Sequence, residues 1–176
     1  MKLTRKHWLI LIVTPLALLA DQLTKLSIHA ALRPFQEIVI VPGYLELIFV
    51  TNRGLAFGMF SGQLGGAATW IFLGITLVAL AIILHLFFQT DNQAVVLPLA
   101  LSLVLAGALG NLIDRFRWGY VVDFMNMHWK HHYWPTYNVA DIAITAGIIL
   151  LIFDSFLPRT GAENKSPAQK PKEQAK

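Results

Sequence analysis

The chain has 176 residues, a mean hydropathy of +0.57 and only 14% charged residues, well below the roughly one quarter that is usual in soluble domains. It contains no cysteine, which excludes a thiol nucleophile, a thiolate metal site and a disulfide framework. Much of the lysine and arginine lies near the two ends, so the net charge of +4 does not predict nucleic-acid binding. Composition and length therefore indicate a membrane protein with one domain.

Four apolar stretches are long enough to cross a bilayer as helices. Each has roughly 18–22 residues, which at about 1.5 Å per residue span a hydrocarbon core of about 30 Å. Isolated strands would leave backbone groups unpaired in lipid, so we expect helices. The predicted spans are residues 8–28, 67–88, 94–113 and 139–156. We predict an all-α membrane domain over residues 1–157 and a disordered cytoplasmic tail over residues 158–176.

Basic residues predict the side of the membrane on which the two ends lie. Lys2, Arg5 and Lys6 precede the first span, and the tail carries five more lysines and arginines. Because positive charge favours the cytoplasmic side, we predict that both termini are cytoplasmic. The rival interpretation is a signal sequence cleaved after Ala20, but Leu18 breaks the A-x-A-like pattern of such sites.

The two longer connections face outward in this topology and contain structural signals of their own. Residues 37–51 are rich in β-branched and aromatic residues and are divided by Pro42-Gly43, which predicts a small two-stranded sheet at the membrane surface. Residues 55–64 are expected to form a short interfacial helix with apolar anchors. Tryptophan and tyrosine crowd residues 118–137, as is typical of a membrane interface.

Polar residues within or beside the spans need an explanation, since carboxylates near lipid are costly and are commonly functional. Asp21 and Lys25 lie four residues apart, which predicts an ion pair near the outer end of the first span, or else a supporting role in a site. Asn138 and Asp141 open the fourth span as N-cap and third helical residue, a variant of the capping box. The helix dipole favours a negative charge at Asp141.

A further polar cluster follows the third span. Asp114 and Arg115 could simply end that helix in water, whereas Asn111 lies one turn deeper and needs hydrogen-bond partners. Asp123, taken alone, could be a surface loop residue. The outer ends of spans one, three and four lie on one side, so their carboxylates can converge, and two close carboxylates that share one proton can activate water to cleave an amide. The aspartates concerned are Asp21, Asp114, Asp123 and Asp141.

Other chemistries have weaker support in the sequence. No His-Glu-x-x-His motif is present, and His128, His131 and His132 have no carboxylate or thiolate beside them, which favours interfacial loop residues over a metal site. Ser102 lies within a span without a nearby lysine or histidine, so a serine dyad is poorly supported. The main alternative is a small four-helix proton-coupled transporter, although transport sites usually lie near the membrane midplane. A non-catalytic scaffold would leave the polar convergence unexplained.

Five motifs in order along the chain resemble those of lipoprotein signal peptidase, also called signal peptidase II. They are residues 21–25 (DQLTK), 51–58 (TNRGLAFG), 110–115 (GNLIDR), 122–124 (VDF) and 137–141 (YNVAD). The resemblance covers the chain from the first span to the fourth. It implies a four-helix aspartic endopeptidase in the bacterial cytoplasmic (inner) membrane, with its active site on the extracytoplasmic side.

The resemblance also implies roles for particular residues. The catalytic pair would be Asp123 and Asp141, with Asp21 and Lys25 stabilising the fold nearby. The substrate-binding set would be Asn52, Gly54, Asn111, Asp114, Arg115 and Asn138. The substrate would be a prolipoprotein signal peptide, cut before a diacylglyceryl-modified cysteine, and no metal or cofactor is expected. Membrane lipid and globomycin-type inhibitors, which occupy the aspartate pair, are the other expected partners of a monomeric enzyme.

Overall fold

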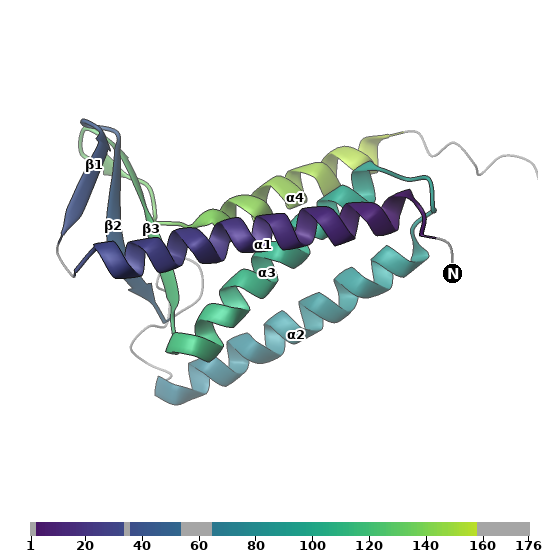
Figure 1. The fold of residues 1–176 in the computed structure, drawn as a ribbon, viewed down its shortest axis with the longest axis horizontal. Coiled ribbons are helices and arrows are strands. Elements are labelled where there is room, and N and C mark those ends of the chain that lie inside the picture. The colour runs from purple at the N-terminus through teal and green to yellow at the C-terminus, as the bar shows by residue number, and fades with distance from the viewer. Residues whose placement is uncertain (1–2, 34–35, 54–64, 158–176) are drawn as a thin grey trace, which may run out of the picture.

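The computed structural model describes residues 3–33, 36–53 and 65–157, apart from the side chains of residues 65–69 and 72. Its helices are α1 (Arg5–Ala31), α2 (Gly65–Gln89), α3 (Val96–Trp118) and α4 (Val139–Phe156). They run along the long axis of the molecule, and a small sheet lies at one end of them (Figure 1). The predicted interfacial helix over residues 55–64, Gly54 and the tail over residues 158–176 lie outside the described residues.

Three of the described helices, α1, α3 and α4, are long and apolar enough to cross a membrane. In α2 the described apolar stretch, Leu73–Gln89, is shorter, so the predicted count of four spans is confirmed only for three. Large apolar side chains such as Leu16 and Phe153 are exposed on the outer surfaces of the bundle, as expected where lipid is the solvent. The chain is a membrane protein whose helices place their apolar side chains outward.

The predicted span limits agree with the structure for the fourth helix and are wrong for the third. Helix α4 begins at Val139 and ends at Phe156, and its N-cap is Asn138. Helix α3 continues five residues past the predicted end at residue 113, because Gly119 at φ +76° provides the left-handed residue that ends it. The prediction that Asp114 and Arg115 end this helix in water is therefore corrected.

Small residues let α3 approach α1 and α4 closely. A Cβ at Gly107 would meet the Ala140 carbonyl oxygen, and a Cβ at Gly147 would meet Val104. At Gly110 a Cβ would overlap a carboxylate oxygen of Asp21. The absence of a side chain at these positions therefore brings the three helices into backbone contact, as is common in membrane bundles.

The sheet has four antiparallel strands in the order β1-β2-β3-β4, where the sequence predicted two. Strands β1 (Glu37–Val41) and β2 (Leu45–Asn52) form the predicted hairpin, which turns through Gly43 at φ +78°. Strand β3 (Val121–Trp129) pairs with β2, and β4 (His132–Tyr133) pairs with β3. The inner face of β3 packs through Val122 and Phe124 against the end of α1, which fixes the sheet on the bundle.

At the other end of the bundle, a buried lysine of α1 links α1 to α2. Lys6 is 5% exposed, and its ammonium group donates to the carbonyl oxygens of Phe87 and Thr90 at the end of α2. A cation beside the last carbonyls of a helix is favourable because these groups carry partial negative charge. The start of α1 and the end of α4 also lie at this end, opposite the sheet (Figure 1).

Candidate active site

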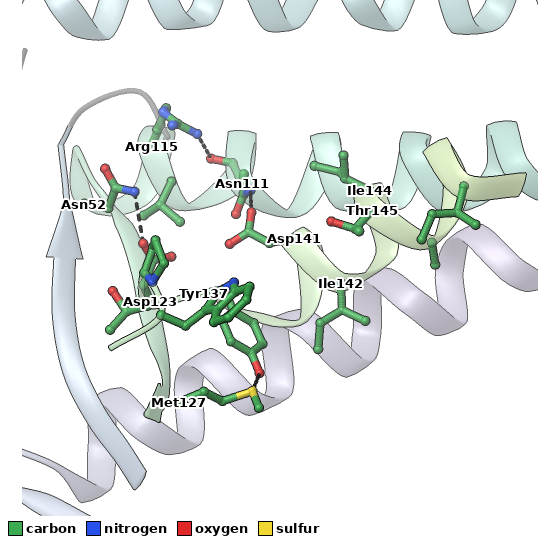
Figure 2. A pocket seen from close by; sticks show the side chains of 16 residues that line it. Asn52, Asn111, Arg115, Asp123, Met127, Tyr137, Asp141, Ile142, Ile144 and Thr145 are labelled. Atoms are coloured by element: carbon green, nitrogen blue, oxygen red, sulfur yellow. Dashed lines mark hydrogen bonds between the residues drawn. The ribbon is translucent and has the colours of Figure 1, made fainter. Parts of the chain in front are cut away.

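A cavity of about 790 Å³ lies where the sheet meets α3 and α4. Its polar end is formed by side chains from β2, α3, β3 and α4, and its apolar part follows α4 away from the sheet (Figure 2). The polar lining residues are Asn52, Asn111, Arg115, Asp123 and Asp141. The apolar and aromatic lining includes Val121, Met127, Trp134, Tyr137, Ile142, Ile144, Ala146 and Ile149. The cavity therefore combines two carboxylates with an apolar channel.

Asp123 projects from β3 into this cavity. It lies opposite Val50 of β2, and its neighbours Val122 and Phe124 point to the other face of the strand, into the core. The carboxylate is 3% exposed and accepts hydrogen bonds from Asn52 Nδ2 at 3.0 Å and from Asn138 Nδ2 at 2.7 Å. The alternative of a surface loop residue is thus wrong, because Asp123 is buried in strand β3.

Burial raises the pKa of Asp123 from 3.8 to about 6. The hydrogen bond from Asn52 acts in the opposite direction, and the charge of Asp141 adds to the increase. A carboxyl group with such a pKa holds its proton more readily than a carboxyl group in water. Asp123 can therefore serve as the protonated member of a pair up to about pH 6.

Asp141 lies in the first turn of α4, as predicted. Its backbone N–H donates to Asn138 Oδ1 at 3.0 Å, and its Oδ2 accepts the Asn138 N–H at 3.2 Å, so the capping box is confirmed. Its Oδ1 accepts a hydrogen bond from Asn111 Nδ2 at 3.0 Å. Both oxygens of Asp141 thus accept hydrogen bonds from N–H donors, one from α3 and one from the N-cap of α4.

Asn138 connects the two aspartates. Its Oδ1 caps α4 through the N–H of Asp141, and its Nδ2 donates to Asp123. The side chain is fully buried and also lies within hydrogen-bond distance of the Val122 carbonyl oxygen. Asp123 and Asp141, which come from different elements, are therefore held on either side of a single carboxamide.

Behind the cavity, Lys25 forms a buried ion triad with Asp21 and Asp114. The lysine Nζ lies 2.9 Å from a carboxylate oxygen of each, and all three side chains are 0–1% exposed. The predicted pair of Asp21 and Lys25 is confirmed, but Asp114 is buried in the same cluster. The four aspartates considered from the sequence thus form two groups, with Asp123 and Asp141 in the cavity and the other two on Lys25.

The triad also binds the backbone next to each cavity aspartate. Asp21 accepts the N–H of Ala140, the residue before Asp141, at 2.8 Å. Asp114 accepts the N–H of Val122, the residue before Asp123, at 3.2 Å. The start of α4 and the start of β3 are therefore attached to the same buried cluster.

The remaining polar residues expected at the site have different positions. Arg115 lines the cavity and donates from Nη1 to the Asn111 carbonyl oxygen at 3.0 Å. His128 and His132 were interpreted from the sequence as interfacial loop residues, which is wrong, because they lie in β3 and β4. The Nε2 atom of His128 is 3.2 Å from Glu46 Oε1. No group of three or more metal-ligating side chains occurs among the described histidines, aspartates and glutamates.

Comparison with known proteins places this geometry in a family. Residues 13–157 match the family model described as Signal peptidase (SPase) II. A lipoprotein signal peptidase of Geobacter metallireducens is 41% identical over 143 residues, which cover 81% of this chain and 87% of that protein. One from Pseudomonas fluorescens is 39% identical over 160 residues, covering 90% and 92%.

The chain belongs to the signal peptidase II family.

Two solved structures described as bacterial membrane enzymes are similar to this signal peptidase II family member throughout the fold. One has a TM-score of 0.78 at 27% identity and covers 100% of this chain and 99% of its own. The other has a TM-score of 0.74 at 30% identity and covers 84% and 92%. The chain is thus a membrane protease with the fold of bacterial membrane enzymes.

The sequence analysis did not assign several residues to this signal peptidase II site. Gln22 donates from Nε2 to both Asp21 and Asp114, at 3.1 and 3.0 Å. The apolar wall formed by α4 was also missed, although Thr145 and Ile149 follow Asp141 at intervals of four residues and so share its helix face. That periodicity was the available signal for the cavity wall. The aromatic residues around Tyr137 were predicted only as interfacial.

Proposed function

We propose that this protein removes the signal peptide from diacylglyceryl-modified prolipoproteins, cutting before the lipid-modified cysteine with water activated by Asp123 and Asp141. Membership in the signal peptidase II family gives the reaction, cleavage of lipoprotein signal peptides. The observation that carries the aspartic mechanism is the placement of two carboxylates on either side of Asn138, at the polar end of an otherwise apolar cavity.

In the proposed reaction the two aspartates share one proton. The ionised carboxylate accepts a proton from water, and the oxygen of that water attacks the scissile carbonyl carbon. The protonated carboxyl group then donates its proton to the leaving nitrogen as the C–N bond breaks. Asp141 suits the role of base because both of its oxygens accept N–H donors, and Asp123 suits the role of acid because burial raises its pKa to about 6.

The carboxamides at the polar end position this pair. Asn52 and Asn138 donate to Asp123, and Asn111 donates to Asp141. This geometry supports a positioning role for the three asparagines, beside the substrate-binding role expected from the sequence. Arg115 lines the same cavity and can bind a substrate carbonyl group, whereas Asp114 acts from behind the cavity through the Val122 backbone. Gly54 remains a predicted substrate contact.

The apolar part of the cavity supports a lipidated substrate. Ile142 and Ile149 line it and are also 46% and 60% exposed on the outer surface of α4. The cavity therefore continues onto a surface that faces lipid in a membrane. A signal peptide and the acyl chains on its cysteine can enter from the bilayer without crossing water, and globomycin-type inhibitors are expected to occupy the same space.

We also propose the membrane placement of the site. With α2 as the fourth span, the bundle crosses the bacterial inner membrane as a monomer, with both termini in the cytoplasm and the sheet outside. This placement is supported by the common end at which α1 starts and α4 stops (Figure 1), and by the basic residues Lys2, Arg5 and Lys6 at the start of the chain. The aspartate pair then lies at the outer interface, away from the midplane where transport sites usually lie.

The test is cleavage of a synthetic diacylglyceryl-cysteine peptide by the purified full-length protein in detergent, with products identified by mass spectrometry. Asp123→Asn and Asp141→Asn should each lower kcat by at least about 10²–10⁴-fold, the usual contribution of a positioned acid or base. Asp154→Asn, on the same helix but near its other end, is the control and should retain activity. Normal cleavage by either site variant contradicts the mechanism, and proton-coupled flux without cleavage would favour a transporter.

A further inference from the structure

Lys25 has a third partner besides the two carboxylates of the buried triad. Its Nζ donates to Asn111 Oδ1 at 2.9 Å, in addition to its contacts with Asp21 and Asp114. An ammonium group has three N–H donors, so these contacts use all of them. The side chain is 0% exposed, which leaves no water to replace a lost partner. One of the three donors is therefore committed to a neutral carboxamide on the cavity side of the triad.

This contact determines which way the Asn111 carboxamide faces. Lysine is only a donor, so the atom of Asn111 that faces Lys25 must be the oxygen. The NH₂ group then faces Asp141, where it donates to Oδ1 at 3.0 Å. If the carboxamide turned over, its NH₂ group would meet the ammonium group of Lys25 and its oxygen would meet a carboxylate oxygen. Both contacts would be repulsive, so Lys25 favours a single orientation. The longer hydrogen bond of 3.3 Å from Asn138 Nδ2 to the same oxygen favours it too.

The orientation matters for the aspartate pair because the carboxamide is half of the donor set on Asp141. The other donor is the Asn138 N–H, on Oδ2. With both oxygens accepting N–H groups, the Asp141 carboxylate is held as an acceptor, and Asp123 with its raised pKa can carry the proton of the pair. Without the Asn111 donor, Oδ1 could carry the proton and donate it to the amide oxygen.

We propose that Lys25 is a positioning residue of the reaction, which acts through the Asn111 carboxamide to keep Asp141 in the form that accepts a proton from water. This inference rests on the proposed aspartic mechanism and adds to the structural role of the buried triad. Lys25 touches neither aspartate of the pair, so its contact influence on Asp141 passes through one oriented side chain, while its charge also acts on Asp123.

Other charged groups near Asp141 act on it at the same time. They are Arg115 from α3 and Asp123 from β3. The charges of the triad, on Asp21, Lys25 and Asp114, lie behind them. Removing Lys25 alone would change both the local charge and the carboxamide orientation. In the double variant Lys25→Met/Asp21→Asn, the triad still carries one net negative charge, as it does in the wild type. The double variant therefore separates orientation from net charge.

The experiment measures kcat/KM against pH for cleavage of a diacylglyceryl-cysteine peptide by the full-length protein in detergent. In the Lys25→Met/Asp21→Asn variant, the acid limb should move to higher pH by about one unit, a typical effect of losing one hydrogen bond to a carboxylate. Below the limb this shift is about a tenfold loss of kcat/KM, and it should appear in kcat more than in KM.

Lys6→Met is the matched control, because Lys6 is a second buried lysine of α1 whose partners lie at the opposite end of the bundle. It should lower the melting temperature and leave the acid limb in place. An unchanged acid limb in the double variant, or an equal shift in Lys6→Met, overturns the proposal.

A second variant keeps the test decisive if the Lys25 variants do not fold. Asn111→Asp retains an oxygen for Lys25 and replaces only the NH₂ group that faces Asp141. It should keep the wild-type melting temperature within a few degrees and move the acid limb upward, because two carboxylate oxygens then face each other. An unchanged acid limb in Asn111→Asp also overturns the proposal. The wild type and Asp141→Asn in the same assay test the aspartic mechanism itself, so the two failures are distinguishable.

Discussion

Asn138 donates a hydrogen bond of 2.7 Å from its Nδ2 to Oδ1 of Asp123 while its own Oδ1 caps α4. One buried side chain thus joins a strand residue to a helix start. The same carboxamide supports the helix cap and the aspartate pair. Its oxygen accepts the Asp141 N–H at the start of α4, and its nitrogen donates to Asp123. A substitution that keeps one function and removes the other can separate them.

Asn138→Ser should retain the cap and lose the donor to Asp123, whereas Asn138→Ala should lose both. We expect similar decreases of kcat, on the order of 10–100-fold, because an activating hydrogen bond is lost in each. The alanine variant should be less stable than the serine variant by about 1 kcal/mol, the usual value of an N-cap. Unfolding in detergent and peptide cleavage measure the two effects. Equal stability of the variants would contradict the cap, and wild-type activity would contradict the role of the donor.

Cleavage should fall as the pH rises through about 6. The pKa of Asp123 is raised to about 6 by burial, so this residue holds its proton below that pH and loses it above. Because the mechanism needs one proton on the pair, kcat/KM should decrease about tenfold for each pH unit above the midpoint. A pH profile with the lipidated peptide measures the alkaline limb. A midpoint above about pH 8 would rule out Asp123 as the acid.

The free energy of unfolding should also depend on the protonation of Asp123 and should decrease as the pH rises. The folded pKa of Asp123 exceeds the ordinary value of 3.8, so its contribution is complete below about pH 3.8 and is lost as the pH rises through about 6. A shift of about two pKa units corresponds to about 3 kcal/mol. Asp123→Asn does not titrate, so the wild type should lose about this much relative to the variant between pH 3.5 and 7.5. A difference between the two proteins that does not vary with pH is the contrary result.

Ala146→Trp should obstruct the apolar part of the cavity. Ala146 lines the cavity on α4, and an indole there would fill space that we assign to the substrate. We expect kcat/KM for the lipidated peptide to fall by at least about tenfold, mainly through KM, because binding is lost while the aspartate pair is intact. Ile148→Trp is the control, since Ile148 is 46% exposed on α4 and does not line the cavity. Equal kinetics for the two variants would exclude substrate from this channel.

Gly110→Ala should destabilise the protein and impair cleavage together. The new Cβ would overlap a carboxylate oxygen of Asp21, which binds both Lys25 and the Ala140 N–H next to Asp141. Overpacking of this kind usually costs about 1–3 kcal/mol. Gly74→Ala is the control, because a Cβ there meets nothing within 4 Å. It should change the unfolding free energy by less than about 1 kcal/mol. A Gly110→Ala protein as stable as the control would show that the contact is not close.

The sequence by itself determined the features whose partners are neighbours along the chain. The bounds and cap of α4 follow from Asn138 and Asp141, three residues apart, and the ion pair of Asp21 with Lys25 follows from helical spacing. The hairpin follows from β-branched residues on either side of a glycine turn. The family motifs likewise lie in short segments, which is why the resemblance named the aspartate pair before any geometry was known.

Only the tertiary structure decided the partners that lie far apart in the chain. Asp114 forms an ion pair with Lys25, and Asp123 lies in β3, which pairs with β2. Both arrangements arise because α1, α3 and the sheet pack together around Gly110 and Val122. Neither partner has a periodic signal, since the residues concerned are about 70–90 positions apart and meet only through packing. Hydrogen bonding between side chains is short-ranged and directional. The orientation of the Asn111 carboxamide therefore follows only from the positions of the groups around it in the tertiary structure.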